Sequence, residues 1–362
     1  MSDERTWDDT EGVPAGSTTA YTAVDTGGVS RFPPGTARCE HCDRDLWDLA
    51  NADGRGDELG PAVVYWCPDC AARQGRRDWP ADPAYQSVGH LGRGLHDTWL
   101  MWQPATGRVL AGRQIGFWKR HEENTRRYIE EVQPLLRLAH PHLSRLLDVH
   151  ASPAGLLVTS AYVPGENLWS YVTRPGRVPS ARLAVEVARG LLDGLGQIHA
   201  LGITHANIHP WNILLPEGAL RRARICLASR GFSYELDTFD PEAYEEPLPT
   251  EEHVIAATFG GAERLAGLYG GTPAADLYAM AQVLYLLLTG ELVLNLPLRS
   301  IRKADFVQLM NLLHHGQPVP VRTRRPDLPA ELAQVVDRAV SRDAAERFQR
   351  VEEFVAALEA VP

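Results

Sequence analysis

The stretch HALGITHANIHPWNILL, residues 199–215, decides the fold of this chain of 362 residues. It follows a predicted helix, because Ser180 can cap a helix that runs to about His199 with apolar side chains at i, i+4 spacing. The stretch holds three histidines and two asparagines but no aspartate or glutamate. An amide cannot take up a proton as a carboxylate does. The stretch therefore offers hydrogen bonds but no carboxylate base.

This stretch resembles the catalytic loop of the bacterial Ser/Thr protein kinases, whose pattern is H-x-x-G-I-x-H-R-D-x-K-P-x-N-I-L. Other motifs of that family flank it in the family's order and at fitting spacing. They resemble the Gly-rich loop, the third strand, the αC glutamate, the hinge, the A-P-E element and helix αF, and they lie at 91–94, 108–113, Glu131, 162–168, 261–263 and 275–291. The resemblance implies an α+β, two-lobed protein-kinase-like fold over 84–360, with a small lobe at 84–161 and a large lobe at 162–360.

The residues depart from the family pattern where the resemblance places the chemistry. The catalytic base of the family, the Asp of H-R-D, is Asn207 here, a swap that should lower the rate roughly 10²- to 10⁴-fold. The lysine two residues later is His209, which has less reach and a pH-dependent charge. Asn212 stands where the family has a metal ligand and is retained.

The D-F-G element of the family, which supplies a carboxylate for the metal, can be aligned in two ways. Residues 229–231 (SRG) fit it directly, and a shifted alignment gives 227–229 (LAS). Neither offers a carboxylate, which Mg²⁺ needs besides the nucleotide phosphates. In the first alignment Arg230 would take the metal's place electrostatically. The resemblance thus leaves ATP as a candidate ligand and argues against Mg²⁺.

The other nucleotide-site positions that the resemblance implies are Gly92, Gly94, Arg113, Glu131 and Ser229. Arg113 replaces the lysine of the third strand, and a planar guanidinium positions phosphates differently from an ammonium group. It can still pair with Glu131, so we expect this brace between strand and helix to persist. The third glycine of the loop is Asp97, whose carboxylate would repel phosphates.

Several residues are expected to serve the structure. In this family Asp276 would bind the catalytic-loop backbone, although it could instead cap its own helix. Glu263 and Arg347 are expected to form a buried ion pair by analogy. Pro134 should kink or end the helix before it. Apolar periodicity predicts a helix buried on all sides and two amphipathic helices, at 276–288, 331–340 and 351–358.

Four of the five cysteines form two C-x-x-C pairs, Cys39 with Cys42 and Cys67 with Cys70. Two such turns can supply four thiolates, in tetrahedral arrangement, to one zinc ion. Disulfides and redox-active pairs are the alternatives, but a reducing compartment disfavours the first and the doubled motif the second. We therefore predict a structural zinc ribbon at 36–75, and an isolated core thiol at Cys226.

Charge and hydropathy narrow the class of protein. The formal net charge of −10 argues against a protein held to nucleic acid by phosphate contacts. No run of 18 apolar residues occurs, and the acidic start lacks the apolar stretch of a signal peptide. We therefore expect a cytoplasmic protein without membrane contact. Residues 1–35 are rich in acid and poor in aliphatic side chains, which predicts a disordered tail.

The residues favour a pseudokinase that acts as a protein-binding or regulatory module. Its partners would be proteins that the sequence does not identify, with the ribbon as a second contact surface. An active Ser/Thr protein kinase with atypical active-site residues is the alternative that the family suggests. A third reading is a sensor that binds ATP without transfer, because Arg113, Glu131 and Asn212 could line a nucleotide site.

Overall fold

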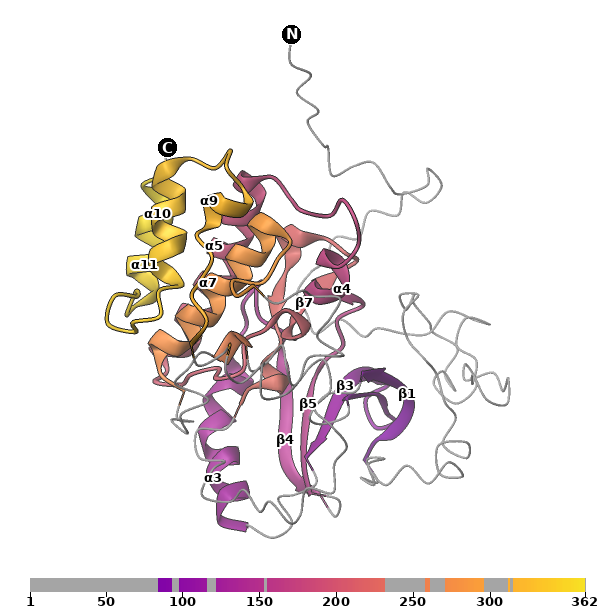
Figure 1. Ribbon diagram of the computed structural model, residues 1–362. Coiled ribbons are helices and arrows are strands. Elements are labelled where there is room, and N and C mark those ends of the chain that lie inside the picture. Colours follow the sequence, from indigo (N-terminus) through magenta and orange to yellow (C-terminus); the bar gives the residue numbers. More distant parts are fainter. Residues whose placement is uncertain are drawn as a thin grey trace.

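A computed structural model describes most of the part of the chain that carries the kinase-like motifs (Figure 1). The described residues are 84–92, 98–115, 122–152, 155–231, 258–260, 271–295, 312 and 315–361. The acidic tail, the four cysteines of the predicted ribbon, Gly94, Asp97 and Glu263 lie outside these ranges. Within them, none of the helices combines the length and apolar character that crossing a membrane requires.

A five-stranded antiparallel sheet forms the first half of the described fold. Its strands are β1 (Gln86–Gly92), β2 (Thr98–Gln103), β3 (Arg108–Ile115), β4 (Leu146–Ser152) and β5 (Gly155–Ala161), in the order β1-β2-β3-β5-β4. Arg113 on the central strand lies opposite Thr98 of β2 and Val158 of β5. Directly opposed residues point to the same face, so the register fixes the face that carries Arg113.

One helix, α3 (Glu122–Val132), lies beside β4 (Figure 1). It ends two residues before Pro134, and a 3-10 helix takes over at Gln133–Arg137. Proline lacks the N–H that an α-helix needs at that point, which confirms the predicted end. Glu131 consequently sits in the last turn of α3, near its carboxyl end.

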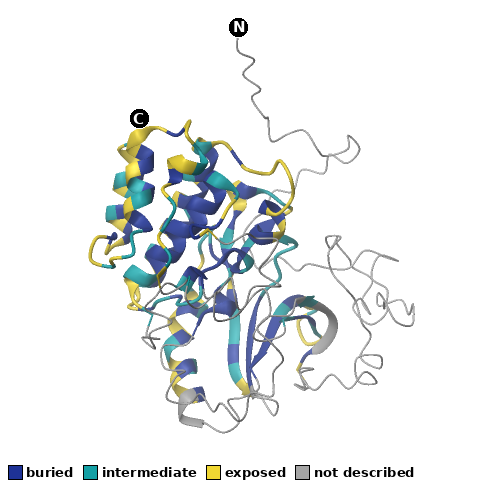
Figure 2. Cartoon of the chain, in the orientation of Figure 1, coloured by how far each residue is buried: buried dark blue, intermediate teal, exposed yellow. Residues whose placement is uncertain are grey.

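The second half of the fold is helical. Its helices are α4 (Leu168–Val172), α5 (Ala181–Ala200), α7 (Pro273–Thr289), α9 (Val321–Arg324), α10 (Ala330–Ala339) and α11 (Val351–Glu359). Ser180 caps α5 by accepting from the Leu183 N–H, as predicted. Every residue from Asp276 to Leu288 of α7 is buried, and Figure 2 shows this helix dark blue at the centre of the helical half. The expected buried helix and amphipathic helices are confirmed.

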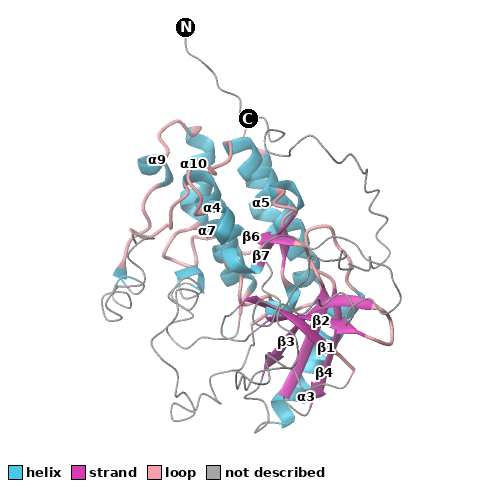
Figure 3. Ribbon diagram, turned by 90° about the vertical axis from the view of Figure 1, so that its right-hand side faces the viewer, coloured by secondary structure: helices cyan, strands magenta, loops and turns pink. Residues whose placement is uncertain are grey.

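A small antiparallel sheet brings together the two loops that correspond to the catalytic loop and the D-F-G element, at 203–212 and 226–231. It contains β6 (Gly165–Asn167), β7 (Ile213–Pro216) and β8 (Arg224–Ile225), and Figure 3 shows β6 and β7 between the helices and the larger sheet. Ile213, which starts β7, pairs with Ile225, which ends β8. Because the strands are antiparallel, the loop that enters β7 and the loop that leaves β8 emerge at the same end. Residues 203–212 and 226–231 therefore meet there.

Candidate functional site

Asp276 of α7 binds the backbone of the loop at 203–212. One carboxylate oxygen accepts the His205 N–H at 2.7 Å and the other accepts the Ala206 N–H at 2.8 Å. His199 adds a third hydrogen bond, 2.9 Å from its Nε2 to Oδ2. The cap of α7 is a different residue, Thr272, whose hydroxyl accepts the Ala275 N–H. Asp276 therefore binds the loop backbone, and the alternative role as an N-cap is wrong.

Ala206 carries backbone strain at the centre of this loop. Its φ is +58°, in the left-handed region that residues with a Cβ rarely adopt. Two glycines pack against it: a Cβ on Gly231 would lie 2.7 Å from the Ala206 carbonyl oxygen, and one on Gly271 would lie 2.6 Å from its Cβ. The Asp276 hydrogen bonds and this close packing hold the strained turn in place.

Asn207, at the position of the catalytic base, points its amide nitrogen at the neighbouring loop. The Nδ2 atom donates to the Ser229 carbonyl at 2.9 Å. A carbonyl only accepts, so this contact requires a side chain with a donor hydrogen, which the amide has and an ionised carboxylate lacks. The contact also places Ser229, rather than Leu227, next to the loop, in keeping with the alignment of 229–231 on D-F-G. The Nδ2 atom of Asn207 thus ties the two loops together.

Asn212 and His209, the next two positions of interest, bond to each other. Asn212 Nδ2 donates to the Asn207 carbonyl at 2.9 Å and lies 2.8 Å from His209 Nε2. The imidazole is 1% exposed and meets the Trp211 ring edge-on at 6.5 Å between centroids. The position at which the family carries a lysine is therefore buried and bonded to Asn212.

His205 is a second buried histidine. Burial lowers its pKa; the nearby Arg230 and Arg113 add to this effect, whereas Asp276 opposes it. Its Nε2 donates to the Cys226 carbonyl at 3.0 Å, and its Nδ1 accepts the Asn207 N–H at 3.3 Å. One ring nitrogen donates and the other accepts, which matches the neutral form.

Arg230 crosses the space between this loop and α3. Its Nε donates to the Thr204 carbonyl at 2.8 Å, and its Nη2 lies 3.2 Å from Glu131 Oε2. The guanidinium also stacks over the Tyr128 ring of α3, 5.8 Å from the centroid. The side chain is only 4% exposed. Arg230 is therefore an internal cross-link between the helix and the loop.

The prediction that Arg113 pairs with Glu131 is wrong. Within the described ranges, Glu131 pairs with Arg230 and, at 3.5 Å, with Arg127 of its own helix. The planar fork of Arg230 reaches α3 from the loop and takes the carboxylate that the strand arginine would need. Arg113 itself is 8% exposed and makes no hydrogen bond or ion pair with the residues that the structure describes.

Sequence reasoning missed this function of Arg230. The available signal was a cation standing at a position where the family has phenylalanine, beside a helix that carries an acid. Gly92, another predicted site residue, ends β1 opposite Thr98, which in turn lies opposite Arg113. The register thus puts Gly92 and Arg113 in one row across three strands.

Two further predicted residues have structural contacts. Arg347 is 3% exposed, donates to the Ser341 and Arg342 carbonyls at 2.6 and 3.0 Å, and stacks 3.8 Å above the centroid of the Tyr278 ring. Its expected partner, Glu263, lies outside the described residues. Cys226 packs against the hydrophobic core, with the Ser229 hydroxyl 3.5 Å from its sulfur.

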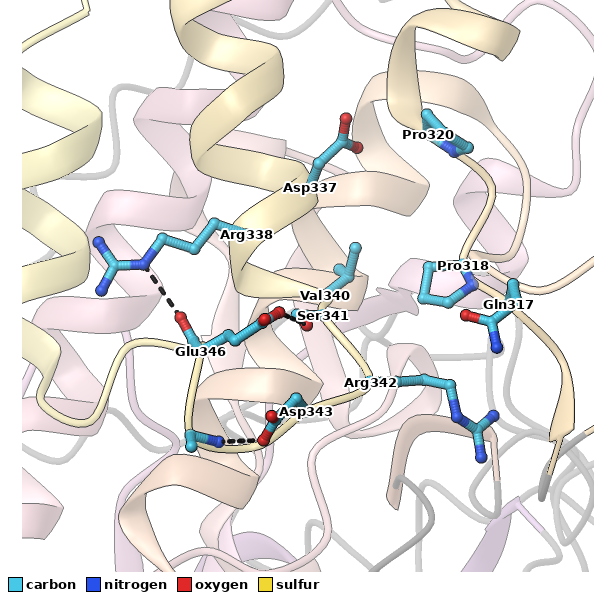
Figure 4. Close-up of a pocket in the computed structure, with 11 residues that line it drawn as sticks. Gln317, Pro318, Pro320, Asp337, Arg338, Val340, Ser341, Arg342, Asp343 and Glu346 are labelled. Atoms are coloured by element: carbon cyan, nitrogen blue, oxygen red, sulfur yellow. Dashed lines mark hydrogen bonds between the residues drawn. The ribbon is translucent and has the colours of Figure 1, made fainter.

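A separate cavity of about 820 Å³ lies beside α10 (Figure 4). Its polar side chains are used locally: Glu346 accepts from the Ser341 hydroxyl, Asp343 accepts the Ala345 N–H, and Arg342 donates to the Gly316 carbonyl. These bonds hold the loop that leaves α10. The lining residues are Gln317, Pro318, Pro320, Asp337, Arg338, Val340, Ser341, Arg342, Asp343, Ala345 and Glu346.

Comparison with known proteins gives the same picture of the fold. The family model described as the protein kinase domain matches residues 85–357. The chain is 26% identical over 279 residues to the serine/threonine-protein kinase pkn3 of Myxococcus xanthus, covering 72% of this chain and 49% of that protein. It is 26% identical over 264 residues to the probable serine/threonine-protein kinase PkwA of Thermomonospora curvata, covering 71% and 32%. The chain thus spans about half or less of the length of these relatives.

A solved structure agrees in fold. The kinase domain of PknI from Mycobacterium tuberculosis superposes with a TM-score of 0.56 at 21% identity, covering 78% of this chain and 98% of that one.

Proposed function

This chain belongs to the protein kinase domain family, and we propose that it is a pseudokinase, a member that does not transfer phosphoryl groups and acts as a protein-binding or regulatory module. The observation that carries the proposal is the hydrogen bond from Asn207 Nδ2 to the Ser229 carbonyl. General base catalysis needs an acceptor aimed at the substrate hydroxyl. Here the side chain at that position is an amide, which cannot take up a proton, and its Nδ2 donates to the protein.

The second support is the use of the nearby carboxylates. Phosphoryl transfer in this family relies on metal ions held by a D-F-G aspartate and the loop asparagine. Asp276 already accepts three hydrogen bonds, and Glu131 is paired with Arg230. Ser229 stands where the metal carboxylate would be. A divalent cation would find little to replace its water ligands among these groups.

The third support is that the contacts that hold the kinase-like fold are kept, although the residues that the family uses for phosphoryl transfer are replaced. Asp276 holds the loop backbone, and α7 is buried through its whole central length. A chain that keeps this framework can present a surface to a protein partner without turnover. The zinc ribbon predicted at Cys39, Cys42, Cys67 and Cys70 would add a second contact surface.

An active Ser/Thr protein kinase is the second candidate, because the curated relatives carry that name. Transfer of radiolabelled phosphate from ATP to generic acceptor proteins, in Mg²⁺ and in Mn²⁺, separates the two. We expect the wild type to give the same counts as Asn207→Ala and Asn212→Ala. Transfer by the wild type and by Arg108→Gln, an exposed control on β3, that both loop variants abolish would favour the active kinase.

A further inference from the structure

Asp337, on the wall of the cavity beside α10, has no cation as a partner among the described residues. Its Oδ1 atom accepts the Val321 N–H at 2.8 Å, and its side chain is half-buried. Burial raises the pKa of this carboxyl group, whereas the hydrogen bond from Val321 lowers it. A carboxylate that has lost water without gaining a cation is stabilised when a cation binds to it.

The carboxyl end of α10 adds to the negative potential at the same place. Asp337 lies in the last turn of this helix, which ends at Ala339 with Val340 as its C-cap. The helix dipole puts partial negative charge at that end, where a cation is stabilised and a carboxylate is not. Val340 and Ser341 also line the cavity. A cation bound there would therefore interact favourably with both the side chain and the helix end.

The two arginines that line the cavity do not supply this cation. The guanidinium of Arg338 stacks 4.2 Å from the centroid of the Phe348 ring. Arg342 Nη1 donates to the Gly316 carbonyl at 2.6 Å. Figure 4 shows both side chains pointing away from Asp337. Each guanidinium is held by its own contact, so the charge that suits Asp337 has to come from a ligand.

The remaining lining favours a ligand with an aliphatic part. Pro318, Pro320 and Val340 put apolar surface among the charged groups of the cavity. Proline has no N–H to donate, so the two proline rings suit methylene groups better than an anion. Long cationic side chains bury their methylene stems on such surface while the charged head reaches a polar partner. The cavity volume of about 820 Å³ lies within the range of roughly 300–1,000 Å³ that small-ligand sites occupy.

We infer that this cavity binds an organic cation on an aliphatic stem, an alkylguanidinium or alkylammonium group whose charged head pairs with Asp337. Two sources carry this chemistry: a free polyamine, and an arginine or lysine side chain of a protein partner. The inference does not depend on the proposed function, because its residues lie outside the loops at 203–212 and 226–231.

NMR titration of the full chain, read at the Val321 amide resonance, tests the inference because that N–H donates to Asp337. The probes, at constant ionic strength, are spermidine, N-acetylarginine methylamide and its uncharged isostere N-acetylcitrulline methylamide. We expect millimolar cation to shift the resonance and the citrulline compound to bind roughly fivefold more weakly. Tighter binding of spermidine identifies a free polyamine as the ligand, and tighter binding of the arginine compound identifies a protein side chain. A resonance that neither cation moves, or equal affinity for the arginine and citrulline compounds, would overturn the site.

Two matched substitutions in the cavity assign the effect. Asp337→Asn keeps the shape and an acceptor for the Val321 N–H, and it should weaken binding of the arginine compound about tenfold. Asp343→Asn makes the same change at the other end of the cavity, where the carboxylate accepts the Ala345 N–H, and should alter affinity by less than about twofold. Without probe, Asp337→Asn should melt no lower than the wild type at neutral pH, because it removes an unpaired charge. Equal losses of affinity in the two variants would show general attraction to an acidic surface and contradict the inference.

Discussion

At the scale of the residue, two asparagines show that the same amide side chain can serve as a hydrogen-bond donor or as an acceptor. Asn207 and Asn167 have the same side chain but use opposite ends of it. Asn207 donates to the Ser229 carbonyl, whereas Asn167 accepts the Ser170 N–H as the cap of α4. Aspartate can replace the second of these and not the first. The two positions therefore form a matched pair within one chain.

We expect Asn207→Asp to destabilise the fold without creating a kinase. The change removes the donor to the Ser229 carbonyl and puts a negative carboxylate against it, at a cost of about 1–3 kcal/mol. Urea unfolding measures the loss, and Asn167→Asp is the control that should unfold as the wild type does. An Asn207→Asp protein as stable as the wild type would show that the amide does not hold the two loops together.

His205 should make the protein sensitive to mild acid. Its pKa in the fold is lowered from the ordinary 6.5, mainly by burial. Below about pH 6.5 the unfolded chain takes up a proton at this site that the folded chain resists. In that range the unfolding free energy therefore decreases as the pH is lowered, by at most about 1.4 kcal/mol per pH unit.

Urea unfolding between pH 7.5 and 5.5 checks the contribution of His205. The His205→Gln variant should show a shallower loss than the wild type, and His315→Gln, at an exposed position, should show the same loss as the wild type. Parallel curves for wild type and His205→Gln would mean that other groups cause the acid sensitivity.

At the scale of the element, α3 is fixed by a residue from another part of the chain. Arg230→Met keeps most of the volume but removes the donor to the Thr204 carbonyl and one of the cations paired with Glu131. We expect a loss of about 1–3 kcal/mol in unfolding free energy and faster hydrogen exchange at 122–132. Arg127→Met, which removes an exposed pair within the helix, should cost only about 0.3–0.5 kcal/mol.

A double-mutant cycle with Glu131→Gln gives the coupling energy of that contact. A coupling near zero between positions 230 and 131 would show that α3 is held by its apolar contacts alone.

The elements were predictable where the signals are local. Ser180 capping, the apolar run of α7 and the proline after Val132 each lie within a few residues of the feature they determine. The contact of Arg230 with Glu131 spans 99 positions of sequence and depends on three elements at once. Arg113 offered an equally plausible partner for that acid. Pattern alone cannot rank two cations for one carboxylate, because the choice depends on reach and direction.

At the scale of the whole molecule, the predicted ribbon and the kinase-like part should be separable. Metal analysis of the full chain purified without added metal should find about one zinc per chain, as four thiolates imply. Cys42→Ser should lower that content and leave the thermal transition of the kinase-like part in place, whereas Cys226→Ser should keep the zinc. Metal-free protein that is otherwise folded would argue against the ribbon.

The anchoring of the loop by Asp276 also affects how this protein can change over generations. The carboxylate binds the N–H groups of positions 205 and 206, which every residue except proline possesses. Mutational drift in the side chains above it can therefore proceed while the turn keeps its shape. The backbone conformation of the loop can therefore be inherited without the phosphoryl-transfer reaction. A lineage can lose turnover and diversify its contacts without having to evolve a new fold.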